Sequence, residues 1–256
     1  MFHRLRDLVL GPPLPTHRLG ERRLNKIQAL AAFSPDALSS IAYANQEIFL
    51  GLGAAGSAGL VLALPVALAI VGVLLIVALS YYQTLHAYPS GGGSWVVARA
   101  NLGLGAGLVA AAALLLDYVL TAAVSLTAGV EATASAFPAL WPHRITLALF
   151  FLLVITLLNL RGLQETGTLL SVPVYGFLVS FFLMLAAGVW KAVTVGQQPM
   201  EAVAPAASAP LTLMLILHAF ATGCTALTGI EAISNGVPAF KPPESENAGK
   251  TLLVMA

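Results

Sequence analysis

Long apolar stretches, separated by clusters of glycine, proline or charged residues, run through the 256-residue chain. No Asp, Glu, Lys or Arg occurs from residue 48 to 98 or from 166 to 190. Apolar runs of about 18 or more residues are typical of membrane-spanning helices. The pattern predicts six spans, at residues 27–50, 58–81, 94–134, 145–159, 168–192 and 211–239. The third range is too long for one crossing, so we expect a short membrane-surface helix before the span itself.

Composition supports an all-α membrane protein. Charged residues make up only 9% of the chain and hydrophobic residues 58%, whereas a soluble domain usually carries about 25% charged residues. This excludes a soluble enzyme, a domain that binds a nucleic acid polymer, and a disordered tail. The single cysteine, Cys224, excludes an intramolecular disulfide.

The distribution of lysine and arginine predicts the orientation, because cytoplasmic loops carry the excess of these residues. With a cytoplasmic N-terminus, two cations lie outside, Arg144 and Lys191. Ten lie inside: Arg4, Arg6, Arg18, Arg22, Arg23, Lys26, Arg99, Arg161, Lys241 and Lys250. We therefore expect a multi-pass protein of the cytoplasmic membrane with both ends of this chain in the cytoplasm.

Three regions follow from this topology. Residues 1–26 form a basic cytoplasmic segment, and residues 27–239 form the transmembrane domain. Residues 240–256 form a cytoplasmic loop and the start of a seventh helix near Asn247, whose apolar run from Thr251 stops after six residues. Six residues cannot span a bilayer, so we expect the chain to be part of a larger protein.

The first and sixth spans contain residues that interrupt helices. Proline removes a backbone donor and clashes with the preceding turn, and paired glycines weaken a helix. The expected interruptions are Ser34 and Pro35 in the first span and Gly223 and Gly229 in the sixth. Interrupted helices in corresponding positions indicate a transporter's binding site. The structural alternative is a kinked helix without a transport role.

Each interruption lies beside an acid at membrane depth, Asp36 or Glu231, and the third span contains Asp117. A charged carboxylate at the bilayer centre costs about 2.5–3.5 kcal/mol on insertion scales. The only basic side chain well inside a span is His218, so these acids have no permanent cationic partner within the chain. A bound cation or protons would offset their charges. Hard cations prefer carboxylate, carbonyl and hydroxyl oxygens, and no paired cysteines or histidine cluster suggests zinc or copper.

Oxygen-bearing side chains recur at helical spacing and therefore share a face in two spans. They are Asp36, Ser40, Tyr43 and Glu47 in the first span, and Asp117, Thr121 and Ser125 in the third. Serine and threonine also bond to their own helix backbone, and the alternative role of Tyr118 is aromatic packing. Glu47 and Glu131 lie near the outer ends of their spans and are excluded from the site.

Five segments together resemble the amino acid–polyamine–organocation superfamily. They are residues 34–43, 88–94, 117–118, 159–162 and 226–235. Within the superfamily, the chain is most similar to potassium/proton symporters of the KUP type, in the KimA branch. The resemblance implies a LeuT-like inverted-repeat fold of twelve helices, with helices 1 and 6 discontinuous, of which this chain is the N-terminal half. It also implies a missing cytoplasmic domain that binds a cyclic dinucleotide, and a possible homodimer formed through the cytoplasmic parts.

The resemblance also implies potassium ligands. They match Asp36, Tyr43, Asp117, Tyr118, Thr121, Ser125, Thr228 and Glu231, with a further tyrosine supplied by a later helix. We expect potassium at Asp36, Asp117 and Glu231. Asp36 and Glu231 are the candidate proton carriers, because an acid that loses its cation favours the protonated form. No cofactor is implied beyond the transported ions, and the lipid bilayer is the surrounding partner.

Two transport functions remain open. The first is proton-coupled potassium uptake, and the second is an amino acid or polyamine permease. Asp36 would repel a substrate carboxylate by about 4 kcal/mol at roughly 4 Å and an effective dielectric constant of about 20. This repulsion counts against amino acids but not against polyamines, which are cations. Either function makes the protein a secondary active transporter and not an enzyme.

Overall fold

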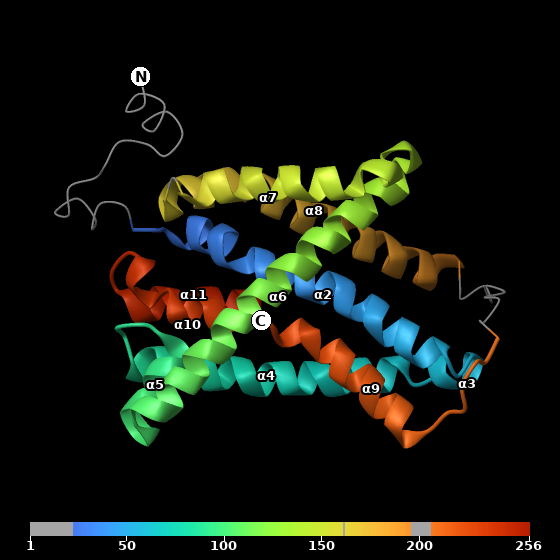
Figure 1. Ribbon diagram of the computed structural model, residues 1–256, viewed down its shortest axis with the longest axis horizontal. Helices are drawn as coiled ribbons and strands as arrows, with labels where there is room; N and C mark the ends of the chain where they lie inside the picture. The colour runs from blue at the N-terminus through green and yellow to red at the C-terminus, as the bar shows by residue number, and fades with distance from the viewer. Residues whose placement is uncertain (1–22, 161, 196–205) are drawn as a thin grey trace.

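The computed structural model describes residues 23–160, 162–195 and 206–256, and these residues form an assembly of helices (Figure 1). The helices are α2 (Lys26–Gly53), α3 (Ser57–Leu60), α4 (Ala63–Ala87), α5 (Gly93–Leu102), α6 (Leu104–Ala136), α7 (Arg144–Leu160), α8 (Leu163–Val195), α9 (Leu213–Gly223), α10 (Glu231–Asn235) and α11 (Glu244–Met255). Short 3₁₀ turns are η2 (Pro138–His143), η3 (Cys224–Leu227) and η4 (Val237–Ala239). The expectation of an all-α fold is confirmed for the described part of the chain.

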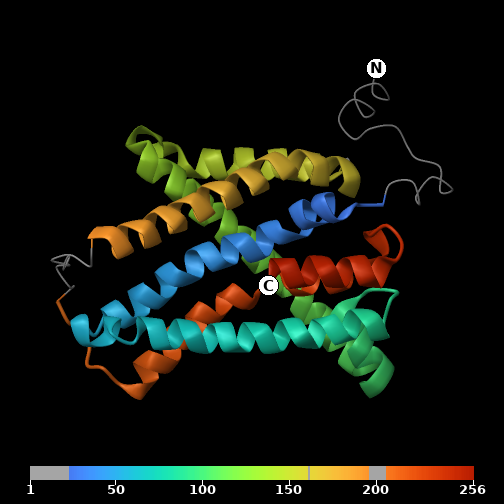
Figure 2. The ribbon, with the colours of Figure 1, turned by 180° about the vertical axis from the view of Figure 1, so that it is seen from behind.

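Five stretches are long and apolar enough to cross a membrane: Ser57–Ala87, Leu104–Ala136, Pro138–Leu160, Gln164–Thr194 and Leu213–Asn235. They correspond to the predicted spans two to six. The first predicted span, α2, is outside this set because it carries more polar side chains. Its 28 residues extend about 42 Å at roughly 1.5 Å per residue, and it runs through the middle of the bundle (Figures 1 and 2). Length and position therefore indicate that α2 also spans the membrane, as the first of six spanning helices in chain order.

The long third range divides as expected into a short helix, α5, and the spanning helix α6. The chain turns between them at Gly103, whose φ of +92° lies in the region that favours glycine. The two helices pack closely, since a Cβ at Gly107 would lie 2.7 Å from the Cβ of Arg99.

The first span does not break at Ser34 and Pro35, which corrects the expectation of a discontinuous helix 1. α2 is helical from Lys26 to Gly53 with Pro35 inside it. Proline removes one backbone donor, but residues on both sides of it are fixed by packing. Ala31, Ser34 and Ala37 are at most 2% exposed. Tertiary contacts thus hold the helix together across a residue that would interrupt it in isolation.

The sixth span is discontinuous, as predicted. α9 ends at Gly223, and one 3₁₀ turn leads to Thr228, whose backbone is extended. Gly229 has a φ of +87°, a conformation that side-chain-bearing residues rarely adopt. α10 then begins at Glu231.

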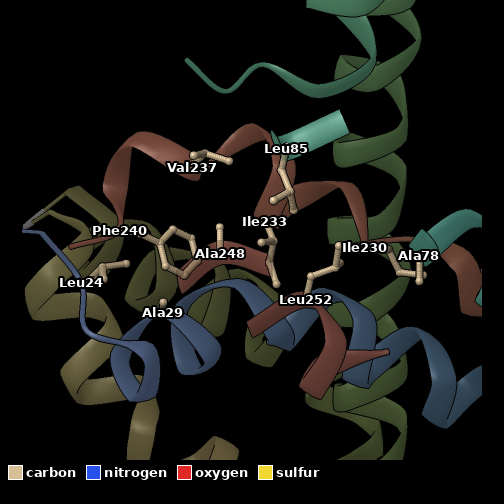
Figure 3. Packing of buried hydrophobic residues seen from close by; sticks show 10 residues of the cluster. All are labelled: Leu24, Ala29, Ala78, Leu85, Ile230, Ile233, Val237, Phe240, Ala248 and Leu252. Atoms are coloured by element: carbon tan, nitrogen blue, oxygen red, sulfur yellow. The ribbon is translucent and has the colours of Figure 1, made fainter. Parts of the chain in front are cut away.

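Two clusters of buried apolar residues hold the two halves of this broken helix against α2 and α4. One contains Ile48, Leu52, Val66, Ile70 and Ala219, and it fixes α9. The other contains Leu24, Ala29, Ala78, Leu85, Ile230, Ile233, Val237, Phe240, Ala248 and Leu252, and it fixes α10 (Figure 3). The non-helical segment between α9 and α10 is therefore held in place at both of its ends.

The seventh helix begins at Glu244, three residues before the predicted Asn247. Pro243 precedes it, and Glu244 and Glu246 in its first turn interact favourably with the positive end of the helix dipole. The start of α11 is tied to the start of α2. Leu24 pairs with Phe240 in an isolated bridge, and Arg23 forms an ion pair with Glu244.

Candidate functional site

The break in helix 6 lies directly against Asp36 of α2. A Cβ at Gly229 would lie 2.6 Å from the backbone nitrogen of Ala37 and 3.0 Å from the Cβ of Asp36. Only glycine allows two backbones to approach this closely. The site therefore begins where the non-helical segment 228–230 meets the middle of α2.

Ser40 is the centre of a hydroxyl network at this contact. Its side chain is fully buried, and its Oγ lies 2.6 Å from Thr228 Oγ1 and 2.9 Å from the Tyr43 hydroxyl. It also lies 3.4 Å from Oδ1 of Asp36. The structure thus brings together three predicted ligands, Asp36, Tyr43 and Thr228, through a serine.

Counting hydrogens shows what the network leaves open. A serine or threonine hydroxyl donates one hydrogen bond. Thr228 Oγ1 donates to the carbonyl of Thr225 at 2.8 Å, so the short contact at 2.6 Å requires Ser40 to donate to Thr228. Tyr43 then donates to Ser40, and Asp36 Oδ1 receives only the long 3.4 Å contact from the Ser40 hydroxyl. The carboxylate is left with spare acceptor capacity for a cation or a proton.

The polar face of α6 lies toward α2, as its spacing predicted. Thr121 is buried, and Ser125 Oγ lies 3.0 Å from Ser39 Oγ. Ser39 in turn donates to the backbone carbonyl of Asp36 at 3.0 Å. A cavity of about 500 Å³ between α2, α6 and α8 is lined by Tyr43, Ser39 and Ser125 among others. Ser125 therefore reaches this region through Ser39, one residue away from the Ser40 network.

A second polar group lies on the α10 side of the break. Glu231 is 6% exposed, and its Oε1 has no hydrogen-bond partner among the described residues. Asn235 donates from Nδ2 to the Tyr118 hydroxyl at 2.5 Å, while its Oδ1 has no partner in the same part of the chain. Nearby, the Tyr81 hydroxyl lies 2.9 Å from Ser94 Oγ. Tyr118 thus contacts α10 and is separate from the Ser40 network.

The three predicted carboxylates lie in one region of the structure, and potassium binding by them stays a prediction. Asp36, Asp117 and Glu231 are close enough to interact electrostatically. However, the described residues contain no group of three His, Cys, Asp or Glu placed to hold a metal ion. Like charges repel, so the three carboxylates destabilise one another unless their charge is offset. None of the three has an ion pair within the described ranges.

The remaining titratable side chains within the predicted spans differ in their exposure. His218 on α9 and Glu131 on α6 are both exposed. Glu47 is half-buried and lies two turns beyond Ser40. Arg161 and residues 1–22 lie outside the described residues.

Sequence reasoning placed Ser40 on the polar face of the first span with Asp36 and Tyr43 but left it out of the ligand set. It missed Ser39 and Asn235. Ser39 is one position off that face, and its role depends on where α6 packs. Asn235 lies within the segment 226–235, but no spacing rule predicts its contact with Tyr118.

Comparison with known proteins relates the whole described region to one family. A family model with the description "Amino acid permease" matches residues 24–256. The potassium transporter KimA of Bacillus subtilis (strain 168) is 45% identical over 258 residues, which cover 100% of this chain and 42% of the relative. The chain therefore spans about two fifths of the length of this curated relative.

Proposed function

The chain belongs to the amino acid permease family, and from this premise we propose that it is the N-terminal portion of a proton-coupled potassium importer. The observation that carries the proposal is the environment of Asp36. Its carboxylate faces the glycine of a broken helix, beside a chain of hydroxyl groups and with no ion pair among the described residues. Such a site attracts a cation with a preference for oxygen ligands.

The ligand set that we propose combines carboxylates with neutral hydroxyl oxygens. Asp36, Tyr43 and Thr228 surround Ser40, which we add to the set. The remaining proposed ligands come from α6 and α10: Asp117, Tyr118, Thr121, Ser125 and Glu231. The 45% identity to a potassium transporter supports potassium as the cation.

The geometry argues against an amino acid as the substrate. A substrate carboxylate needs free backbone N–H groups, such as those at a broken helix. α2 is continuous, so the segment around Pro35 offers no such set. The N–H groups at the start of α10 lie beside the carboxylate of Glu231 and close to that of Asp36. Polyamines are cations and are therefore the alternative to be separated by experiment.

We further propose that Asp36 and Glu231 carry the coupled protons. Both are acids at membrane depth, and a deeply buried carboxylate requires neutralisation. Oε1 of Glu231 has no partner in the described part of the chain. A proton on either acid would replace the charge compensation that potassium supplies.

The arrangement of cations supports a cytoplasmic N-terminus. The start of α2 with Lys26, the helix α5 with Arg99 and the loop before α11 with Lys241 lie at one end of the bundle (Figure 1). The helix starts and ends that carry Arg144 and Lys191 lie at the other end. By the positive-inside rule the first end is cytoplasmic. Residues 23–26 and 240–243 then face the cytoplasm.

The rest of the transporter is the first proposed partner of this chain, since the chain covers 42% of its relative. The second inverted repeat would supply further ligands, including a tyrosine. A cytoplasmic domain that binds a cyclic dinucleotide, and a homodimer formed through it, complete the proposal.

The test is growth and rubidium uptake in bacteria that lack potassium uptake systems and express the complete transporter. The native protein restores growth at low potassium, and collapse of the pH gradient abolishes rubidium uptake. Asp36→Asn and Asp117→Asn each abolish uptake at normal expression. Glu131→Gln, a change at an exposed acid on α6, is the matched control and retains uptake.

Two outcomes would contradict the proposal. Rescue by both aspartate variants at the native level would remove the role of the carboxylates. Uptake of labelled spermidine that excess potassium does not reduce would assign the protein to the polyamine permeases. Uptake that persists after the pH gradient has collapsed would contradict the proton coupling alone and would leave potassium as the substrate.

A further inference from the structure

A second pocket, distant from the transport site, lies at the end of the bundle where α2 and α11 begin. It has a volume of about 320 Å³ and is lined by Lys26, Ile27, Tyr175, Lys250 and Val254 among others. These residues come from α2, α8 and α11, three helices that are far apart in the sequence. None of them takes part in the hydroxyl network around Ser40.

The lining of this pocket contains two cations, Lys26 and Lys250, and the carboxylate of Glu246 interacts with both. Lys26 and Lys250 are both exposed. Lys26 is the first residue of the 28-residue α2, so it lies at the positive end of that helix dipole. Lys250 forms an i,i+4 ion pair with Glu246 at 2.5 Å, with both side chains more than half exposed. An exposed pair of this kind is weak, so Lys250 can exchange this partner for another anion.

The other wall of the pocket is apolar and open. Ile27 is 62% exposed and Val254 is 73% exposed. Tyr175 closes the inner side, since its hydroxyl donates to the carbonyl of Ile27 at 3.0 Å. The pocket therefore combines two cations with an apolar surface at the end of membrane-spanning helices. A free phosphate ion would use the cations only, whereas a phospholipid would use both parts.

We infer that this pocket binds the headgroup of an anionic phospholipid, with the phosphate at Lys26 and Lys250 and an acyl chain along Ile27 and Val254. Basic pockets between transmembrane helices recognise anionic headgroups in this way. Binding would link α2, which carries Asp36, to α8 and α11. The inference is independent of the transported substrate, because it depends only on the membrane location of these helices.

The test is native mass spectrometry of the complete transporter in detergent, titrated with phosphatidylglycerol in the absence of potassium. A saturable adduct is expected for the native protein. Each lysine near an anionic lipid surface is expected to change the affinity about fivefold, so Lys26→Gln with Lys250→Gln weakens binding about 25-fold. The conservative pair Lys26→Arg with Lys250→Arg retains binding. Lys241→Gln, an exposed lysine outside the pocket, is the matched control and has no effect.

Three results would overturn the inference. Equal binding of phosphatidylcholine would show that charge is not recognised. Competition by glycerol 3-phosphate at the same concentration would show that the acyl wall contributes nothing. Undiminished phosphatidylglycerol binding by the double glutamine variant would place the lipid elsewhere. If that variant failed to fold, the single change Lys250→Gln would carry the same test with a fivefold expectation.

Discussion

The hydroxyl of Ser40 lies 2.6 Å from the hydroxyl of Thr228, although the two residues are 188 positions apart in the chain. This contact joins the continuous helix α2 to the extended residue in the break of helix 6. Because Ser40 is fully buried, water cannot replace the bond if either partner is lost. The pair therefore sets the distance between Asp36 and the non-helical backbone of the break.

Replacement of Ser40 by alanine should impair potassium binding without preventing folding. The change leaves the half-buried hydroxyls of Tyr43 and Thr228 without their common partner, which costs up to about 1–3 kcal/mol. If that cost falls on the potassium-bound state, the KM for rubidium uptake rises at least about fivefold. Ser57→Ala, a change at an exposed serine, should leave KM unchanged. A native KM in Ser40→Ala would show that the network does not position the ligands.

Replacement of Gly229 by alanine should destabilise the protein. The φ of +87° costs a residue with a side chain about 1–3 kcal/mol, and the new Cβ would lie 2.6 Å from the nitrogen of Ala37. We expect a lower thermal midpoint in detergent and a loss of uptake. Gly72→Ala in α4 is the control, since its Cβ would meet nothing within 4 Å. A native midpoint for Gly229→Ala would mean that α2 and the break are not packed as described.

Replacement of Tyr118 by phenylalanine separates a ligand role from a packing role. The change removes the acceptor of the Asn235 amide, and a buried donor left unpaired costs about 1–3 kcal/mol. We expect a lower thermal midpoint that Asn235→Ala partly restores in the double variant. If Tyr118 is also a potassium ligand, the KM for rubidium should rise in the single and the double variant alike. A KM restored together with the midpoint would assign Tyr118 to packing alone.

Acid should weaken the attachment of the start of α2 to α11. The backbone N–H of Glu244 and, next, the hydrogen bond from Arg23 hold the pKa of the Glu244 carboxyl below its ordinary value of 4.5. A lowered pKa stabilises the folded state above pH 4.5, and this contribution is lost as the pH falls through the folded pKa. The thermal midpoint of Glu244→Gln should therefore lie below the native one at pH 6 and approach it below pH 4.5. Glu131→Gln should show no such convergence, and a constant difference for Glu244→Gln would refute the ion pair's contribution.

The sequence predicted the helices well where a local rule applies. Apolar runs located the spans, because a helix that crosses lipid must be long and apolar. Glycines at 223 and 229 correctly predicted the discontinuous sixth helix, since the φ of Gly229 is a local property. The same kind of rule was wrong at Pro35, because its local cost is outweighed by the packing of Ala31 and Ala37.

The candidate site was only partly predictable for the same reason. Spacing placed Asp36 and Tyr43 on one face of α2, and the structure joins both to Thr228 through Ser40. No spacing rule indicates that Ser125 reaches α2 through Ser39, or that Tyr118 contacts Asn235. These contacts depend on the rotation and crossing of α6 relative to its neighbours.

By itself, the sequence determined the membrane location, the order of the helices, the interruption of helix 6 and the presence of acids at depth. Each of these follows from composition or from backbone conformation within a few residues. Only the tertiary structure decided that helix 1 stays continuous and that Ser40 links Asp36 to Thr228. The physical reason is that packing between helices, which short-range patterns do not encode, sets which oxygen atoms come within a few ångströms of one another.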